Sequence, residues 1–563
     1  MRASRLGHLP FPSTGQRIRT ALYPVIPSTR SQSTSTSTVT SSSSRPLKLA
    51  IVGAGPSGFY AAWRVLSSVH LDSPAGRNVE VHMYERLPTP YGLVRYGVAP
   101  DHPEVKNCQS KFDELSADPR FRFFGNTLIG SPSTSDPTRA TPLTALSAYT
   151  YPHALHVPLS SLLPYYSSLL LTYGASLSNP LSSVPGSSSS SNPLVNVFPA
   201  LAFVSWYNGH PAFADLPVDL RGIEDVSVVG QGNVALDVAR ILLKGANGLE
   251  GTDMPESVLE VLSKSAVRRV RAVGRRGPGQ VAFTTKEFRE MVSLPDTAFA
   301  GLNGPLMEEG KGAVEGDRMR KRLLALMEKP NGVAGPKSFE LDFLHSPKAF
   351  IPGETGKVSA VDWDLNALLH APHPSPVPPT SQEGSVPSPS PKASAAAMVA
   401  RPTGETVRIP TDMVVESVGY RSEPLDGEGW VLPFDSRRGR VSNIGGRVVD
   451  DSGMAIPGVY AAGWAARGPV GVIASTMHDA FSLAAEILED HFDMPPPAAS
   501  TSPLALTSPE QGVPEAVQRG LDERQVVDLE SWRKIDAAEV GRAKGKGKER
   551  EKFTRVEDML AVI

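Results

Sequence analysis

One apolar run that breaks into three glycines and then resumes as a helical pattern constrains this chain more than any other stretch. The run KLAIVGAGPSGFY, residues 48–60, predicts a strand, a tight turn and a helix. Gly53 would make the turn, Gly55 would let the backbone approach a pyrophosphate, and Gly58 would let the helix lie close on the strand. The helix N-terminus would offer free N–H groups to the phosphates. We therefore predict a dinucleotide site at Gly53, Ala54, Gly55, Pro56, Ser57 and Gly58.

A second stretch, VSVVGQGNVALDVAR at 226–240, repeats the pattern with Gly230, Gly232 and Ala235 at the three positions. The strand predicted after it, 269–274, ends on Arg275 and Arg276 instead of a carboxylate. An acid there would repel a ribose 2′-phosphate, whereas guanidinium groups pair with one bidentately. The second site is therefore predicted to take NADPH in preference to NADH. The alternative is a solvated charge run at a strand end.

Three side chains near these turns are candidates for chemistry. Glu85 ends the strand-like run NVEVHMYER, where a dinucleotide site binds ribose hydroxyls. His102 lies in the loop 89–107, which is rich in Gly and Pro. Asp237 lies one turn beyond Asn233 on the second predicted helix. The alternatives are a surface Glu, a solvated or capping His, and an Asp paired with Arg240.

Composition excludes several classes of protein. The chain has 563 residues, which suggests two or three domains at about 150 residues each. Its 56 basic and 58 acidic residues nearly balance, so nucleic acid is not the default partner. A single cysteine, Cys108, excludes an internal disulfide, a C-x-x-C pair and a cysteine-ligated iron–sulfur cluster. Redox chemistry would therefore need a bound cofactor. The sequence marks no metal site, and its apolar runs fall short of the about 18 residues of a membrane span.

Several segments indicate how the chain is organised. Residues 1–46 are rich in Arg, Ser and Thr, and the first carboxylate of the chain is Asp72. That composition is typical of an organelle transit peptide, and the alternative is an unstructured basic tail. Residues 131–160 resemble an insertion, the Ser run 187–191 a flexible loop tip or hinge, and 371–400 a low-complexity loop. The tail from 495 is predicted to be loosely held.

Two late features favour a cofactor and a partner. In GVYAAGWAARGPVGVIASTM, a helix N-terminus near Gly471 and the ring of Trp464 could lie beside a planar cofactor head. The alternative is that Trp464 only packs. The run RMRKR at 318–322, with Arg289 nearby, could dock an acidic protein, although such runs are often a solvated helix face.

Taken together, these motifs resemble the NADPH-dependent ferredoxin reductases of the adrenodoxin reductase type, found in mitochondria. The stretches that carry the resemblance are IVGAGPSGFY, PYGLVRYGVAPDHPEVKN, SWYNG, GQGNVALDVARILL, VGRRGP, VAFTTKEFREM, ESVGY, GWAARGPVGVIASTM and, in the tail, ESWRKIDAAEVGRA. The resemblance implies an α/β fold with two Rossmann-like domains of the three-layer β/β/α, glutathione-reductase-like type. An NADPH domain at 186–412 would be inserted into an FAD domain at 47–185 and 413–563, after a transit peptide at 1–46.

The resemblance also implies roles for individual residues. FAD would contact Ser57, Glu85, Leu93, Ile129, Trp464, Gly471, Val472 and Ile473. NADPH would contact Gln231, Gly232, Asn233, Val234, Arg275, Arg276 and Glu287. His102 and Asp237 would be the catalytic pair near the flavin, and Arg289, Arg318 and Arg322 would dock an acidic [2Fe-2S] ferredoxin. A monomer in the mitochondrial matrix or on the matrix side of the inner membrane is implied, with peripheral membrane association open.

The implied reaction is hydride transfer from NADPH to FAD, followed by two single-electron transfers to a ferredoxin. One alternative is an NADPH-dependent flavin monooxygenase or dehydrogenase that acts on a small molecule. Another is a non-catalytic, nucleotide-sensing interaction protein that kept the fold. The sequence marks no substrate pocket beside the flavin, and the two complete glycine motifs weigh against a protein that lost its cofactors.

Overall fold

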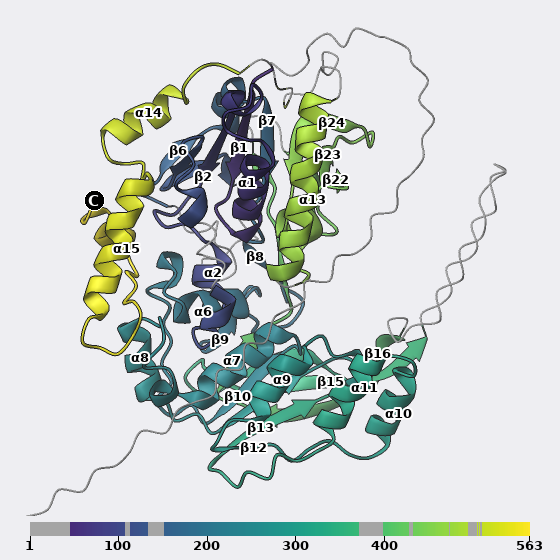
Figure 1. The fold of residues 1–563 in the computed structure, drawn as a ribbon. Coiled ribbons are helices and arrows are strands. Elements are labelled where there is room, and N and C mark those ends of the chain that lie inside the picture. Colours follow the sequence, from purple (N-terminus) through teal and green to yellow (C-terminus); the bar gives the residue numbers. More distant parts are fainter. Residues whose placement is uncertain are drawn as a thin grey trace, which may run out of the picture. The chain divides into compact units, whose positions relative to one another are not determined.

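Two sheets organise the chain, and each is built around a parallel strand that leads into a glycine turn (Figure 1). The first sheet is mixed, since β22, β23 and β24 pair antiparallel at one edge, and the second is parallel throughout. The computed structural model describes residues 45–106, 113–132, 151–370, 398–426, 432–471, 473–493, 504, 506 and 509–563. The strand β1 (Leu47–Val52) is buried along its whole length, between β2 and β7, which run parallel to it. Burial on both faces explains why its sequence is an apolar run without alternation.

The first sheet has the strand order β22-β23-β24-β7-β1-β2-β3. Its other strands are β2 (Val79–Tyr84), β3 (Phe121–Phe124), β7 (Ser168–Leu171), β22 (Asn443–Ile444), β23 (Arg447–Val449) and β24 (Ala455–Ala461). The helices α1 (Pro56–Ser68) and α13 (Ile473–Phe492) lie side by side on one face (Figure 1) and pack against Leu49 and Ile51 of β1. Residues after 440 therefore complete a sheet that begins at residue 47.

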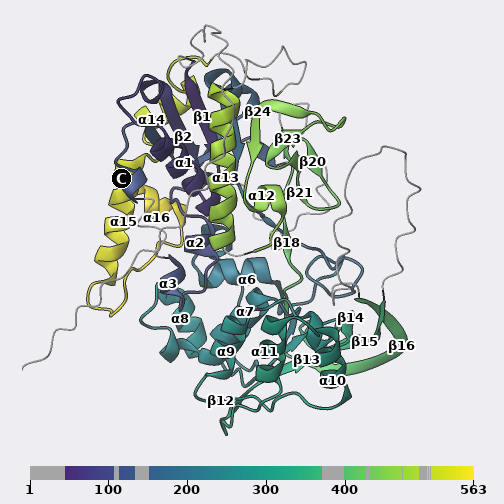
Figure 2. The same ribbon diagram turned by 45° about the vertical axis from the view of Figure 1, so that its right-hand side comes forward.

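The second sheet has the order β12-β13-β11-β10-β17-β9, and its strands are parallel. They are β9 (Val197–Pro199), β10 (Asp225–Val229), β11 (Arg269–Val273), β12 (Thr297–Ala298), β13 (Lys337–Asp342) and β17 (Met413–Glu416). A small antiparallel sheet of β14 (His345–Pro352), β15 (Val358–His370) and β16 (Met398–Pro410) packs on one face, where Trp363 and Val361 meet Val229 and Val273. Helices cover the other face (Figure 2). These layers, and the origin of the second sheet between β7 and β22, confirm the predicted fold class.

The remaining helices and strand pairs complete the described part of the fold. The helices are α2 (Leu93–Tyr96), α3 (Pro103–Lys106), α5 (Leu159–Leu162), α6 (Ala200–Tyr207), α7 (Asn233–Lys244), α8 (Glu256–Ser263), α9 (Thr285–Val292), α10 (Pro305–Ala313), α11 (Arg318–Met327), α12 (Trp464–Arg467), α14 (Glu515–Asp522), α15 (Leu529–Ala543) and α16 (Val556–Leu560). The paired strands are β4 (Thr127–Ile129) with β6 (Leu155–Val157), β5 (Ser131–Pro132) with β19 (Leu425–Asp426), β8 (Leu177–Ser178) with β18 (Tyr420–Arg421), and β20 (Phe434–Asp435) with β21 (Arg440–Val441).

The structure corrects the prediction that the Ser run is a flexible hinge. Ser187 and Ser188 are 0% and 1% exposed. The hydroxyl and the backbone N–H of Ser188 both donate to the buried carboxylate of Glu416 at the end of β17. Small hydroxyl side chains can pack tightly around a buried acid, which composition alone does not reveal.

Two boundaries differ from the expected ones. The strand β17 begins at Met413, the first residue assigned to the second FAD segment, yet it pairs with β10 in the second sheet. Residues 398–400 of the expected low-complexity loop belong to β16, and residues 371–397 lie outside the described residues. In the expected insertion 131–160, Val157 and Leu159 are buried. The domain limits themselves stay predictions.

From residue 509 on, the described part of the C-terminal tail is packed against the rest of the chain, contrary to the expectation of a loosely held tail. The side chains of Trp532 and Ile535 on α15 belong to the core under the first sheet. Gly125 and Val527 exchange backbone hydrogen bonds of 2.8 and 3.0 Å, which attaches the tail beside β3. Within 515–563, tertiary contacts outweigh a charged and glycine-rich composition. The predicted transit peptide lies outside the described residues apart from positions 45 and 46, and no described helix is long and apolar enough to cross a membrane.

Candidate cofactor sites and the charged cluster between them

The first glycine turn has the geometry that the sequence predicts. Gly53 has φ 106°, and a Cβ on it would lie 2.7 Å from the backbone of Thr172. A Cβ on Gly58 would lie 2.5 Å from the carbonyl oxygen of Gly53, so the helix can approach the strand only because both are glycine. At Gly55, in contrast, a Cβ would meet none of the described atoms within 4 Å. The open side of the turn at Gly55 therefore leaves room for a ligand against the backbone.

Glu85 lies at the carboxyl end of β2, beside this turn. One carboxylate oxygen accepts from Ala54 N at 2.8 Å and the other from Leu87 N at 3.2 Å. Burial raises the pKa of Glu85, against the opposing charge of Arg86 and these backbone hydrogen bonds. The carboxylate of Glu85 therefore lies at the end of the second strand, and a backbone N–H of the glycine turn donates a hydrogen bond to it.

The late glycine turn meets the first one. Gly463 has φ 62°, and a Cβ on it would lie 2.8 Å from the Cβ and Oγ of Ser57. The hydroxyl of Ser57 is buried and has no hydrogen-bond partner among the described residues. A buried polar atom of this kind normally has a partner, so an unpaired one fits a ligand at this position.

Other predicted FAD contacts come from four elements. Gly92 has φ 45°, and a Cβ on it would lie 3.1 Å from Gly55 Cα, so the start of α2 with Leu93 is close to the turn. Ile129 is 3% exposed in β4. Trp464 begins α12 with its ring 6.2 Å from that of Tyr420, and Gly471 and Ile473 stand at the start of α13, while Val472 lies outside the described residues.

The second glycine turn repeats the geometry of the first. Gly230 has φ 124°, and a Cβ on it would lie 2.1 Å from the carbonyl oxygen of Ser417, whereas a Cβ on Gly232 would meet none of the described atoms within 4 Å. The side chain of Gln231 donates to the carbonyl oxygens of Ala272 and Asp342, at 3.1 and 2.8 Å. It thereby ties the turn to the ends of two neighbouring strands. Val234 follows in the first turn of α7.

Two of the predicted NADPH contacts lie near the start of α9. Asn233 Oδ1 accepts from the backbone N–H of Thr284 at 2.8 Å, which fixes the start of α9 against α7. Thr284 in turn caps α9, since its hydroxyl accepts from Glu287 N at 3.4 Å. Glu287 therefore lies in the first turn of α9, beside the glycine turn.

The end of β11 is cationic. Burial lowers the pKa of Arg276, and the charges of Arg275 and Arg320 lower it further. No salt bridge of Arg275 or Arg276 is found among the described residues, and Arg320 lies 3.5 Å from Asp317. Neighbouring guanidinium groups without a carboxylate fit an anionic ligand such as a 2′-phosphate. The sequence predicted Arg320 only as part of the basic run 318–322 and did not assign it to this site, because α11 lies far along the chain from β11.

His102 and Asp237 are brought to one cluster of charged side chains. His102, 8% exposed, is hydrogen-bonded through Nε2 to Glu290 Oε2 at 2.6 Å. Asp237 Oδ1 lies 2.9 Å from Nη2 of Arg240, three residues later on α7. Burial raises the pKa of Asp237, and the charges of Arg240 and His102 oppose that rise. The cluster joins the loop before α3 with α7 and α9.

Glu287 belongs to the same cluster. Burial raises its pKa, and the charge of Asp237 raises it further. His102, Glu287 and Glu290 bring ligand atoms within 4.8 Å of one another, a geometry that a metal ion could use. However, Arg240 Nη1 lies 3.6 Å from Glu287 and 3.8 Å from Glu290, so a guanidinium already neutralises these carboxylates. The sequence did not identify Arg240 or Glu290 as site residues, because only the fold places them around His102.

The predicted basic face lies on α9 and α11, which pack against each other (Figure 2). Arg289, Arg318 and Arg322 are exposed, and none of them forms a salt bridge within the described part of the chain. These cations are therefore available to a partner.

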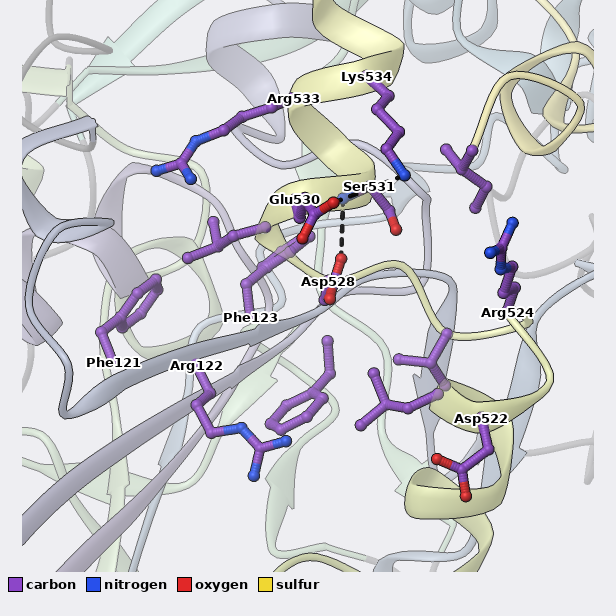
Figure 3. A pocket seen from close by; sticks show the side chains of 15 residues that line it. Phe121, Arg122, Phe123, Asp522, Arg524, Asp528, Glu530, Ser531, Arg533 and Lys534 are labelled. Atoms are coloured by element: carbon purple, nitrogen blue, oxygen red, sulfur yellow. Dashed lines mark hydrogen bonds and ion pairs between the residues drawn. The ribbon is translucent and has the colours of Figure 1, made fainter.

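A cavity of about 570 Å³ lies elsewhere, between β3 and the segment from α14 to α15 (Figure 3). Its rim carries Arg122, Arg524 and Lys534 together with Asp522 and Glu530. No residue predicted to bind a cofactor lines it, so this cavity is separate from both glycine turns.

Comparisons with known proteins find relatives over most of the chain, although no family model matches it. The chain is 38% identical over 528 residues to the mitochondrial NADPH:adrenodoxin oxidoreductase of Drosophila melanogaster, covering 92% of this chain and 93% of the relative. It is 35% identical over 539 residues to the human protein of the same name, covering 92% of each. It is 33% identical to the NADPH-ferredoxin reductase FprA of Mycobacterium tuberculosis, covering 92% and 99%. The solved structure of Mycobacterium tuberculosis FprA in complex with NADPH matches with a TM-score of 0.71 and 31% identity, over 92% of this chain and 99% of that one.

Proposed function

The chain belongs to the family of NADPH:adrenodoxin oxidoreductases, and on that premise we propose that it transfers electrons from NADPH through a bound FAD to a [2Fe-2S] ferredoxin. The observation that carries the proposal is the pair of glycine turns at the carboxyl ends of parallel strands in two separate sheets, with a carboxylate beside one turn and an arginine pair beside the other. Ligands of open α/β sheets bind at such strand ends.

The first turn is proposed to hold FAD. Open space at Gly55 suits a pyrophosphate, Glu85 suits the ribose hydroxyls, and the unpaired hydroxyl of Ser57 suits a ligand oxygen. Leu93, Ile129, Trp464 and the turn at 471–473 complete the proposed contacts. When bound, FAD supplies the step between a two-electron donor and a one-electron acceptor.

The second turn is proposed to hold NADPH. Open space at Gly232 again suits a pyrophosphate, and the cationic end of β11 suits the 2′-phosphate. In this assignment Gln231, Asn233 and Val234 shape the turn, and Glu287 faces the cofactor from α9. His102 and Asp237 orient the reacting groups and exclude water, and neither acts as a nucleophile.

The proposal also covers the surface that binds the ferredoxin and the cellular location of the protein. Exposed cations on α9 and α11 suit an acidic ferredoxin, because complementary charge accelerates encounter. The Arg-rich, acid-free segment 1–46 and the names of the relatives support a mitochondrial protein, on the matrix side and monomeric. The domain limits are proposed as predicted, at 47–185, 186–412 and 413–563 after the segment 1–46. The strand β17, which begins at Met413, pairs with β10 of the second sheet.

The test uses the purified full-length protein. We expect a yellow flavin spectrum, and we expect NADPH oxidation to require an added [2Fe-2S] ferredoxin and to reduce it. NADPH oxidation that proceeds with a small molecule and not with ferredoxin would favour a flavin monooxygenase or dehydrogenase. A colourless protein that binds NADPH would favour a nucleotide-sensing protein.

A further inference from the structure

Arg240 is the centre of the charged cluster between the two sheets. Its side chain is 3% exposed. Nε and Nη2 each donate to a carboxylate oxygen of Asp101 at 3.0 Å, so the two groups face each other as a fork. Lys244, one turn further along α7, donates to the same carboxylate at 3.0 Å. A planar guanidinium makes such a paired contact and an ammonium does not.

The contact joins parts of the chain that carry different predicted functions. Asp101 directly precedes His102 in the loop 89–107, which follows β2. Arg240 lies on α7, the helix of the second glycine turn, which also carries Asp237. The same guanidinium lies 3.6 and 3.8 Å from the carboxylates of Glu287 and Glu290 on α9. Arg240 therefore contacts Asp101, the neighbour of His102 in the chain, and Glu290, its hydrogen-bond partner, as well as Asp237.

Several polar atoms in this cluster lack a hydrogen-bond partner among the described residues although they are buried. They are Nη1 of Arg240 and Oε2 of Glu287, which lie 3.6 Å apart, and the hydroxyl of Tyr207. Burial and the charge of Asp237 raise the pKa of Tyr207 well above its ordinary value, so this hydroxyl keeps its proton and can donate. Unpaired donors and acceptors of this kind fit a polar group that enters the cluster on binding.

We propose that Arg240 is a positioning residue for hydride transfer, which holds the His102 loop and the Asp237 helix in register while its Nη1 edge faces the reacting groups. The inference rests on the proposed function. Arg240 acts through Asp101, Asp237 and Glu290 and is not itself a catalytic residue. A guanidinium is required because a lysine cannot hold Asp101 in a fork and contact Glu287 and Glu290 with the opposite edge.

The test compares Arg240→Lys with wild type and with Arg120→Lys as the matched control. Arg120 is also largely buried and also makes a paired contact, with Asp118, but at the opposite end of the first sheet before β3. FAD content, the Kd for NADPH and the rate of flavin reduction by NADPH in anaerobic stopped flow are measured on each holoenzyme. We expect Arg240→Lys to keep its FAD and to bind NADPH within about threefold of wild type, and to reduce the flavin roughly 10- to 100-fold more slowly. Arg120→Lys should match wild type in all three.

The outcomes separate the inference from the proposed function. Wild-type protein without flavin, or with flavin that NADPH does not reduce, contradicts the proposed function. If NADPH reduces the flavin of wild type and reduces that of Arg240→Lys at the same rate, the inference alone is overturned. It is also overturned if Arg240→Lys changes only the Kd for NADPH. If Arg240→Lys does not fold, Asp101→Asn weakens the same fork and keeps the guanidinium. It should slow flavin reduction at least about tenfold without loss of FAD, and an unchanged rate overturns the inference.

Discussion

Arg95 on α2 and Glu539 on α15 lie 444 positions apart in the chain and form an ion pair whose side chains are 2% and 0% exposed. The same carboxylate accepts from the backbone N–H of Phe553 at 2.9 Å. The ammonium of Lys552 donates to the carbonyl oxygens of Arg95 and Asn208, at 3.0 and 3.2 Å. The C-terminal segment thus connects the loop beside the first glycine turn with the end of α6, which packs on the second sheet.

The Arg95–Glu539 pair should matter strongly for stability. Glu539→Gln leaves a buried guanidinium without its countercharge, so we expect a loss of about 3–5 kcal/mol in the free energy of unfolding, measured by urea denaturation. Glu549→Gln is the control, since Glu549 is exposed and forms no salt bridge among the described residues. A Glu539→Gln midpoint equal to that of the control would contradict a structural role for the tail.

The buried lysine predicts a specific pH dependence. Burial lowers the pKa of Lys552 to about 7, against the charge of Asp253, whereas the pKa of a lysine in the unfolded chain is the ordinary 10.5. Between these values the unfolded chain binds more protons than the folded one, so this group's contribution to stability rises with pH from about 7 to 10.5 and falls as the pH is lowered. From pH 7.5 to 9, wild type should gain stability relative to Lys552→Met, by up to about 1.4 kcal/mol per pH unit. The measurement is urea unfolding at both pH values. Lys546→Met, an exposed position, should keep the wild-type slope, and equal slopes in all three proteins would contradict the shifted pKa.

The arginine pair at the end of β11 should decide between the two nicotinamide cofactors. Arg275→Ala with Arg276→Ala removes the groups assigned to the 2′-phosphate, so the KM for NADPH should rise at least about tenfold and the KM for NADH should change little. Arg269→Ala, at the start of the same strand and paired with Asp225 at 2.9 Å, serves as the control. Equal effects on both cofactors would count against 2′-phosphate recognition.

The basic face should act on the partner and leave the internal reaction unchanged. Arg289→Glu, Arg318→Glu and Arg322→Glu together should lower ferredoxin reduction about tenfold at low salt and leave flavin reduction by NADPH unchanged. In wild type, ferredoxin turnover should fall as the Debye length shortens below about 8 to 10 Å. Arg437→Glu, an exposed arginine after β20, is the control. Turnover that does not depend on salt would instead indicate an apolar interface.

Loss of either predicted catalytic side chain should slow the reaction and keep the cofactor. His102→Ala and Asp237→Ala should each reduce the rate of flavin reduction by about tenfold or more, because both side chains orient the reacting groups. His156→Ala, an exposed histidine on β6, should behave as wild type. The ratio of flavin absorbance to protein absorbance measures how much FAD each variant retains. If a variant lost FAD, the replaced side chain would have a structural role and not a catalytic one.

The sequence by itself predicted the two dinucleotide turns, because strand, glycine spacing and helix are local patterns whose backbone requirements can be read over about a dozen residues. It also predicted Glu85 and the Arg275–Arg276 pair, since each follows directly from the end of the next strand. Local patterns of this kind, and the resemblance that they carry, were sufficient for the fold class.

Only the tertiary structure decided which distant residues meet. Arg240 pairs with Asp101, Arg95 with Glu539, and Ser188 with Glu416. From local composition, Arg240 was predicted to lie on a polar helix face, Glu539 in a loosely held tail, and Ser188 in a flexible loop tip or hinge. The physical reason is that a buried charge or hydroxyl is stable only with a partner at hydrogen-bond distance. Which partner that is depends on how the sheets and helices pack, and no spacing within one segment encodes it.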